Sequence, residues 1–242
     1  MSKLNLQDVT DYVEKNIGSF HAARLQALSG LGLKKILQRK NPYLFKAKNI
    51  LTSGALVTTL LDAHLSSQEE TMFGQFLEEL AIFICGKVYK GKKSAAEGID
   101  LEFTKGAVKY IVAIKSGPNW GNSSQIRKME DDFGRAKRVL GTNTSKTNIV
   151  AVNGCCYGRE NQPDKGSYLK YCGQAFWEFI SGNQDLYIEI VEPLGHKAKE
   201  KNDEFQKAYA QIINNFTSEF SKEFCTKGHI DWQKIVELNS KK

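Results

Sequence analysis

Apolar and polar residues alternate along two short runs between residues 99 and 115, and a glycine separates the runs. This pattern predicts a β-hairpin whose central turn residues are Gly106 and Ala107, because a type II′ turn favours glycine at its first central position. The pairing then places Leu101 opposite Val112. Successive strand residues point to opposite faces of a sheet, so the pattern assigns each hairpin side chain to one of two faces.

The two faces of the predicted hairpin differ in character. One is apolar and is expected to face the core, with Ile99, Leu101, Phe103, Val108, Tyr110, Val112 and Ile114. The other carries Asp100, Glu102, Lys109, Ile111, Ala113 and Lys115. Asp100 and Lys115 therefore share a face at the open end of the hairpin, about 7 Å apart along the strand. A carboxylate and an ammonium placed there form either a structural ion pair or part of a metal and catalytic site.

The rest of the chain mixes helical and strand patterns. Apolar residues at helical spacing predict helices over 5–17, 54–65, 68–85, 123–140, 167–180 and 196–225. Short apolar runs predict strands over 86–90, 148–153 and 186–191. Ser66 and Ser67 are expected to cap the helix that follows them, and Ser123 or Ser124 to cap the helix that ends near Leu140. Alternating helices and strands indicate an α/β protein.

Charge narrows the classes of partner. The net charge is +7 at pH 7 over 242 residues, which favours an anionic partner, with nucleic acid the leading candidate. Residues 18–40 contain a basic run, which is either an arm that touches DNA phosphates or a solvated helix face. No apolar run reaches the length of a membrane span, so a cytoplasmic protein without a membrane partner is expected.

The five cysteines favour free thiols in a reducing compartment, because their number is odd and Cys155 and Cys156 are adjacent. Zinc binding by Cys155, Cys156, Cys172 and His196 is the alternative.

The hairpin is similar to a known motif. An Asp at the start of one strand, with a Lys ending the next strand fifteen positions later, resembles the PD-(D/E)XK nuclease superfamily. The local match covers residues 71–153, and the whole chain looks most like a type II restriction endonuclease of that superfamily. The motif departs from the pattern at Ala113, two residues before Lys115, where the family has an acidic residue.

This resemblance implies a fold and a domain plan. The fold is an α/β PD-(D/E)XK nuclease core, an α-β-β-β-α-β mixed sheet flanked by helices, with helical N- and C-terminal elaborations. The chain is expected to form a single nuclease domain over 1–242. Its parts are a helical N-terminal part (1–66), the nuclease core (67–153) and an α/β and helical C-terminal part (154–242).

The resemblance also implies an Mg²⁺ site and the residues that serve it. Asp100 would bind the metal, and Lys115 would orient or deprotonate the attacking water and offset negative charge. Glu78 or Glu79, on the helix before the hairpin, would complete the catalytic set; two surface glutamates are the alternative. The carboxylate that Ala113 lacks is expected from Glu130, as a catalytic and metal-binding residue. The alternatives are Gln125 and Asp132, and last Glu102.

The loop after Lys115 is the predicted DNA contact. Its amides and hydroxyls suit base edges or phosphates, and its tryptophan offers a stacking surface. A polar loop with capping serines is the alternative. The predicted DNA-binding residues are Asn119, Trp120, Asn122, Ser124, Gln125 and Arg127.

The expected function is therefore that of an Mg²⁺-dependent type II restriction endonuclease that cuts double-stranded DNA at a short specific sequence. It would act as a homodimer, because each subunit cuts one strand of a two-fold site. A cognate DNA methyltransferase is expected in the same system, but not as a binding partner. Two alternatives remain: a catalytically inactive DNA-binding protein on a nuclease scaffold, which Ala113 favours, and a structure-specific DNA repair or junction nuclease.

Overall fold

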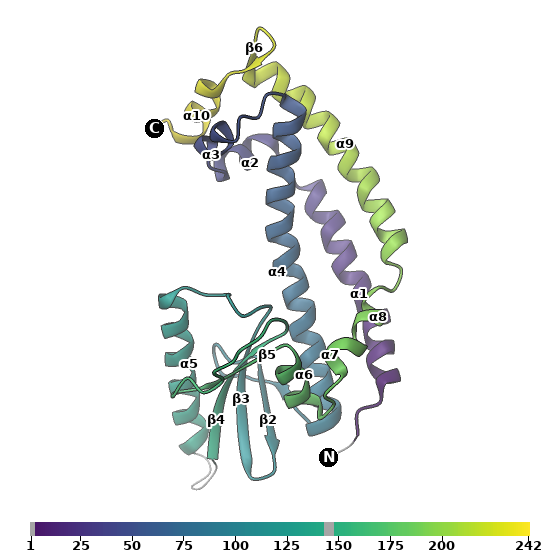
Figure 1. Cartoon of the computed structure of the whole chain (residues 1–242), viewed down its shortest axis with the longest axis vertical. Helices are drawn as coiled ribbons and strands as arrows, with labels where there is room; N and C mark the ends of the chain where they lie inside the picture. The colour runs from purple at the N-terminus through teal and green to yellow at the C-terminus, as the bar shows by residue number, and fades with distance from the viewer. Residues whose placement is uncertain (1–2, 143–147) are drawn as a thin grey trace. The chain divides into compact units, whose positions relative to one another are not determined.

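The computed structural model describes residues 3–142 and 148–242. The chain forms two compact units (Figure 1). The first, the sheet unit, consists of Met1–Ile17 and Phe73–His196, and the second, the helical unit, consists of Gly18–Met72 and Lys197–Lys242. Two long helices, α1 (Leu6–Ser29) and α4 (Ser53–Tyr89), contribute residues to both units.

The sheet unit is built on five strands in the order β1-β2-β3-β4-β5. Their bounds are β1 Lys92–Lys93, β2 Leu101–Lys105, β3 Val108–Lys115, β4 Asn148–Cys155 and β5 Leu169–Cys172. The first three strands pair antiparallel, and β3, β4 and β5 pair parallel, so the sheet is mixed. The helices of this unit are α5 (Ser123–Thr142), α6 (Gln174–Ser181), α7 (Leu186–Glu189) and α8 (Val191–Leu194). The predicted α/β class is confirmed, with a mixed sheet flanked by helices.

The hairpin forms in the predicted register. Leu101 pairs with Val112 across β2 and β3, and the turn falls at Gly106-Ala107. Gly106 has φ +63°, whereas Ala107 has no positive φ, as a type II′ turn requires. The backbone twist of this turn matches that of the paired strands, so turn and alternation select the same register.

Both faces of the sheet are buried. On one face, Phe103 stacks on Tyr89 at the end of α4 and contacts Phe179 of α6, with ring centroids 5.4 Å and 5.2 Å away. On the other face, Ile111 and its neighbours pack under α5, in a cluster of Ile99, Ala113, Met129, Phe133, Ala136 and Ala151. The assignment of Ile99 to the face of Leu101 is therefore wrong. Ile99 lies before β2, next to Gly98 with φ +75°, where strand alternation does not apply.

The helical unit is assembled from helices and one small hairpin. Besides its parts of α1 and α4 it contains α2 (Leu33–Arg39), α3 (Pro42–Ala47), α9 (Ala198–Phe224), β6 (Cys225–Thr226), β7 (His229–Ile230) and α10 (Trp232–Ser240). Its main core joins α2, α4, α9 and α10 through buried residues that include Leu37, Leu60, Phe220 and Ile235. The predicted helix 196–225 is confirmed as α9, because its aromatic residues at helical spacing fill this core.

Helix α4 corrects two predictions. It is one helix of 37 residues where two helices and a cap at Ser66-Ser67 were expected. Ser67 does not cap: its Oγ donates a hydrogen bond to the Ala63 carbonyl one turn back, at 3.3 Å. The predicted strand 86–90 is also wrong, because α4 continues to Tyr89 and is followed by Lys90, which has φ +58°.

Two further predictions are wrong after β4. The segment predicted as one helix over 167–180 begins with β5, and only Gln174–Ser181 is helical. Gly173, with φ +53°, separates the two elements. The predicted strand 186–191 is instead the short helices α7 and α8. Pairing with β4 makes β5 a strand, and that partner is invisible to a local reading of the sequence.

Candidate active site

The open end of the hairpin brings Asp100 and Lys115 together. The Asp100 N–H donates to the Val112 carbonyl at 2.9 Å, so Asp100 extends the pairing by one residue beyond β2. Its Oδ2 accepts a hydrogen bond from the Ile114 N–H at 2.6 Å and lies 4.0 Å from Lys115 Nζ. The side chains of Asp100 and Lys115 are 22% and 32% exposed. The Asp100 carboxylate is therefore held by the backbone of the hairpin, and both side chains remain accessible to a substrate.

Helix α4 adds Glu78 to this pair. Burial raises the pKa of Glu78, and the Asp100 carboxylate raises it further, whereas Lys93 and Lys115 lower it. Glu78 Oε1 also lies 3.6 Å from Lys93 Nζ. Because Lys93 pairs with Leu101, the residue after Asp100, this ion pair locates Glu78 near the open end of the hairpin.

The neighbouring glutamate has other surroundings. Glu79 Oε1 accepts a hydrogen bond from Gln75 at 3.3 Å, and its charge acts on Tyr12 of α1. One residue of helix rotates a side chain by about 100°, which accounts for the different environments. Of the two predicted glutamates, the structure brings Glu78 to Asp100 and not Glu79.

The Asp100 carboxyl is itself only partly compensated. Burial raises its pKa, and the Ile114 N–H, Lys115 and Lys93 lower it by less than burial raises it. Glu78 and Asp100 are thus two half-buried carboxyls, each harder to ionise than in water. A cation bound between such groups would relieve this cost.

The candidates for the carboxylate missing at Ala113 have other partners. Ala113 is itself buried against α5. Glu130 Oε1 accepts a hydrogen bond from Ser167 Oγ at 2.9 Å, and Asp132 pairs with Lys128 and Arg135. Glu102 lies 3.2 Å from both Lys92 and Lys109, and Gln125 bonds to Asn122. Among the described residues, no hydrogen bond or ion pair joins any of these four to Asp100. Glu78 differs from them because the Asp100 carboxylate raises its pKa and Lys115 lowers it.

The loop after Lys115 is anchored by a residue that the sequence did not single out. Trp120 Nε1 donates to Asn153 Oδ1 at 3.1 Å, and the Lys115 ammonium lies 5.3 Å from the centre of the Trp120 ring. Asn153, on β4, is 1% exposed, and its Nδ2 donates to the Ala113 carbonyl at 3.2 Å. A polar residue inside an otherwise apolar buried strand was the available signal for this role.

The start of α5 is capped by Asn122 and not by Ser123 or Ser124. Asn122 Oδ1 accepts from the Gln125 N–H at 3.1 Å, and Gln125 Oε1 accepts from the Asn122 N–H at 3.0 Å. This reciprocal pair is a capping box. The side chains of Asn122 and Gln125 are therefore engaged with backbone, whereas Ser124 and Arg127 line a cavity of about 290 Å³ on α5. Asn119 lies in the same loop, just before Trp120.

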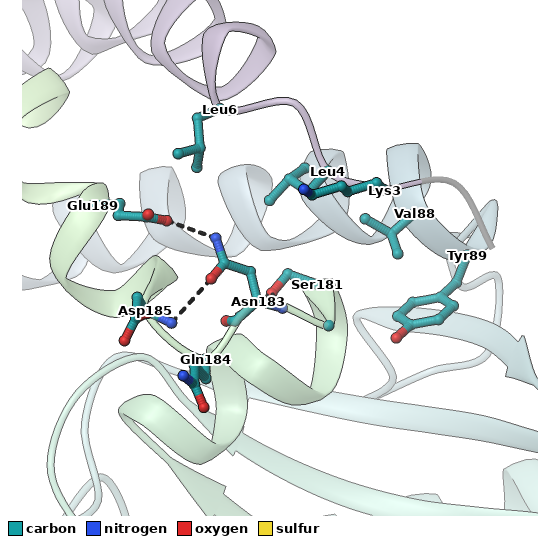
Figure 2. A pocket seen from close by; sticks show the side chains of 11 residues that line it. Lys3, Leu4, Leu6, Val88, Tyr89, Ser181, Asn183, Gln184, Asp185 and Glu189 are labelled. Atoms are coloured by element: carbon teal, nitrogen blue, oxygen red, sulfur yellow. Dashed lines mark hydrogen bonds between the residues drawn. The ribbon is translucent and has the colours of Figure 1, made fainter.

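A larger cavity of about 640 Å³ lies elsewhere in the sheet unit, between residues 3–6, the end of α4 and residues 181–189 (Figure 2). Figure 2 shows Asn183 between Asp185 and Glu189. Its Nδ2 donates to Glu189 Oε2 at 2.6 Å, and its Oδ1 accepts from the Asp185 N–H at 3.0 Å. These polar groups satisfy one another, and no residue predicted for catalysis or DNA contact lines this cavity.

The cysteines are free thiols. Cys155 and Cys172 face each other across β4 and β5, and burial raises the pKa of each. His196 contacts Glu14 at 3.4 Å. In the part of the chain that the structure describes, no group of three or more His, Cys, Asp or Glu residues is arranged to hold a metal ion.

A family of known proteins matches most of the chain. Residues 7–202, about four fifths of the chain, match the family described as type II restriction endonuclease EcoO109I. The chain belongs to the EcoO109I family of type II restriction endonucleases. No curated protein matches the chain.

Membership of the EcoO109I family defines the activity. The protein is a type II site-specific DNA endonuclease, a hydrolase whose substrate is double-stranded DNA. Enzymes of this type generally need a divalent metal ion. The matched residues include Glu78, Asp100 and Lys115. Within the described residues, no helix is long and apolar enough to cross a membrane.

Proposed function

We propose that this EcoO109I-family enzyme is an Mg²⁺-dependent endonuclease that cuts double-stranded DNA at a short specific sequence, with Asp100, Glu78 and Lys115 as its catalytic residues. The observation that carries the proposal is the coupling of the two carboxyls to each other and to Lys115 at one end of the hairpin. Phosphodiester hydrolysis needs a held cation, a positioned water and a compensating positive charge.

The residues at this site fit Mg²⁺. Asp100 and Glu78 offer carboxylate oxygens, the donor type that Mg²⁺ prefers, and Mg²⁺ commonly binds through one or two carboxylates together with substrate phosphate. Both pKa values are raised by burial, so the pair carries charge that its surroundings compensate only in part. Mg²⁺, when bound, supplies charge stabilisation for the phosphate and acidifies a water. Glu130 stays a prediction as a further metal ligand.

Lys115 holds a positive charge where the attacking water would meet the phosphate. Its ammonium is positioned by Asp100 Oδ2 on one side and by the Trp120 ring on the other. In this role it orients the water, accepts part of the charge that develops on the phosphoryl oxygens, and favours the hydroxide form. Asn153 positions Trp120 and so acts through it on Lys115.

The element order supports a PD-(D/E)XK core. Helix α4 is followed by β1, β2, β3, α5 and β4, which is the α-β-β-β-α-β order of that superfamily. Asp100 and Lys115 stand at the positions of its Asp and Lys, and Ala113 at the position of its second acid. In this proposal Glu78 on α4 replaces that missing carboxylate as the second acidic residue of the site.

DNA contact and assembly complete the proposal. The loop and helix start that carry Asn119, Trp120, Asn122, Ser124, Gln125 and Arg127 contact the DNA beside the site. The enzyme works as a homodimer, because a two-fold DNA site with one cut in each strand needs two copies of the site. It acts in the cytoplasm beside a cognate methyltransferase that it does not bind.

The test is digestion of a plasmid with purified protein and Mg²⁺. The wild type is expected to give discrete bands. Asp100→Ala and Lys115→Ala are expected to abolish cutting while DNA binding persists, because they remove the cation ligand and the ammonium. Glu78→Gln is expected to lower the cleavage rate at least ~100-fold, on the scale of losing a group that acts in the transition state.

Glu79→Gln is the matched control, since it makes the same chemical change one residue along α4 and should cut like the wild type. Discrete bands with Asp100→Ala and Lys115→Ala would refute the site. Equal losses in Glu78→Gln and Glu79→Gln would refute the role of Glu78. Cleavage of branched DNA without sequence preference would replace site-specific cutting with a structure-specific activity.

A further inference from the structure

The helical unit has a cavity of its own. It measures about 310 Å³ and lies between α1, α2 and α4. Helix α2 supplies Lys35 and Arg39, and α4 supplies His64 and Gln68. Each pair is spaced four residues apart, so each pair shares one face of its helix. No Asp or Glu is among the residues that line this cavity.

The two cations of this cavity have no acidic partner among the described residues, in contrast to other cations of the basic run 18–40. Lys34 lies 2.7 Å from Glu223, and Arg24 lies 2.6 Å from Glu69 and also stacks over an aromatic ring. Within residues 3–142 and 148–242, neither Lys35 nor Arg39 forms an ion pair with an acidic side chain. The structure thus divides the basic run of residues 18–40 into cations that hold the fold together and cations that face an open cavity.

The wall opposite these cations is polar and neutral. Burial lowers the pKa of His64, and the positive charges of Lys40 and Arg39 lower it further, which favours its neutral form. Gln68 contributes an uncharged amide to the same wall. Two cations and no acidic side chain among the described lining residues give this cavity a positive potential, which suits an anion.

We propose that this cavity binds a backbone phosphate of the DNA substrate, with Lys35 and Arg39 as the residues that contact it. The proposal rests on the proposed function and deepens it, by adding a DNA contact in the helical unit to the contacts expected beside the active site. Contacts to phosphate fix the position of a protein on the duplex and carry no sequence information. The cavity therefore contributes affinity and leaves the choice of cut site unchanged.

The test measures binding of a fluorescent DNA duplex of arbitrary sequence at a series of salt concentrations, without divalent metal. Each phosphate contact contributes roughly 0.9 to the slope of log affinity against log salt. Lys35→Gln and Arg39→Gln are each expected to reduce that slope by about one, and the double variant to weaken binding about tenfold or more at moderate salt. Lys34→Gln is the matched control, because it removes the same charge from the next residue and should leave the slope near that of the wild type.

Gly32→Asp separates a binding role from a structural one. Gly32 lines the cavity, precedes α2, has φ −130° and ψ 130°, and a Cβ added there would meet no atom within 4 Å. An Asp at this N-cap position suits the helix, so the thermal midpoint should not fall. Its negative charge faces Lys35 and Arg39, so DNA affinity should fall.

A slope in Lys35→Gln and Arg39→Gln equal to that of the wild type would overturn the proposal, and so would equal losses in Lys34→Gln. The plasmid digestion reports separately on the active site. If the wild type cuts plasmid and the Lys35 and Arg39 variants bind DNA with an unchanged salt dependence, only the proposed phosphate contact in the cavity is refuted. A thermal-shift series with inorganic phosphate distinguishes the source of the anion. Stabilisation of the wild type by free phosphate, lost in Lys35→Gln/Arg39→Gln while DNA affinity is unchanged, would assign the cavity to a free anion and refute DNA contact.

Discussion

Asp100 and Glu78 are both harder to ionise in the folded protein than in the unfolded chain, and burial is the main cause for each. An acid whose folded pKa is raised keeps its proton to higher pH in the folded state. The contribution of these two groups to the stability of the metal-free protein therefore falls as the pH rises from about 4, the ordinary pKa of an Asp, through the raised value. The ionised carboxylates of Asp100 and Glu78, which the reaction requires, therefore destabilise the metal-free folded protein.

This cost leads to a prediction for Asp100→Asn in metal-free buffer. Asn keeps an oxygen that accepts the Ile114 N–H but carries no charge. Near neutral pH the variant is expected to be more stable than the wild type, and the difference should disappear in acid, where Asp100 is protonated. Thermal midpoints from pH 4 to pH 8 measure this. A variant that is less stable at neutral pH would show that the attraction of Lys115 outweighs burial.

Asn153 shows how one buried polar side chain connects core and site. Its amide accepts from Trp120 and donates to the Ala113 carbonyl, so both ends are satisfied inside the sheet. A buried amide that loses its partners costs roughly 1–3 kcal/mol, so this arrangement is strongly specified. The Trp120 ring, and with it one side of the Lys115 ammonium, is therefore positioned by the second parallel strand of the sheet.

Among the elements, the long helix α4 contributes residues both to the candidate active site and to the cavity of the helical unit. It runs without a break through Ser66 and Ser67, and it supplies Glu78 to the hairpin and His64 to the helical-unit cavity. The serines resemble a cap in sequence, but their backbone groups already bond within the helix. Serine stabilises a helix when it is the N-cap residue and destabilises the helix when it lies in the interior, so these two serines would affect stability in opposite directions in the predicted and the observed structure.

Ser67→Ala tests the continuous helix. In a helix interior, alanine is favoured over serine by up to about 0.5 kcal/mol, so the free energy of unfolding should rise slightly. At an N-cap, the same change would lower it by about 1 kcal/mol. Ser67 is exposed, which leaves no packing contribution to obscure the sign. Urea denaturation with a common slope measures the difference, and a clear loss would mean that a helix starts at this serine.

For the whole molecule, metal binding and folding are linked. A ligand that binds only the folded state stabilises it by about 2.7 kcal/mol at a concentration one hundred times its dissociation constant. Mg²⁺ without DNA should therefore raise the thermal midpoint of the wild type. It should have little effect on Asp100→Asn, because a neutral amide replaces a charged ligand. Equal rises in both proteins would place the ion elsewhere.

The sequence by itself determined the hairpin and the two residues, Asp100 and Lys115, that lie at its open end. The period of two and the turn at Gly106 both select one register, and that register alone brings Asp100 to Lys115. It likewise determined α9, whose apolar residues repeat at helical spacing. These features depend on neighbours along the chain or across one tight turn, so local patterns contain them.

Only the tertiary structure decided the rest. Whether Glu78 or Glu79 meets Asp100 depends on how α4 is rotated against the sheet, and residues 169–172 become a strand because β4 is there to pair with them. Lys34 and Lys35 look alike in sequence, yet one meets Glu223 on α9 and the other faces a cavity. In each case the deciding partner is far away in the chain, and a periodic pattern shows which face of an element is buried but not what lies opposite it.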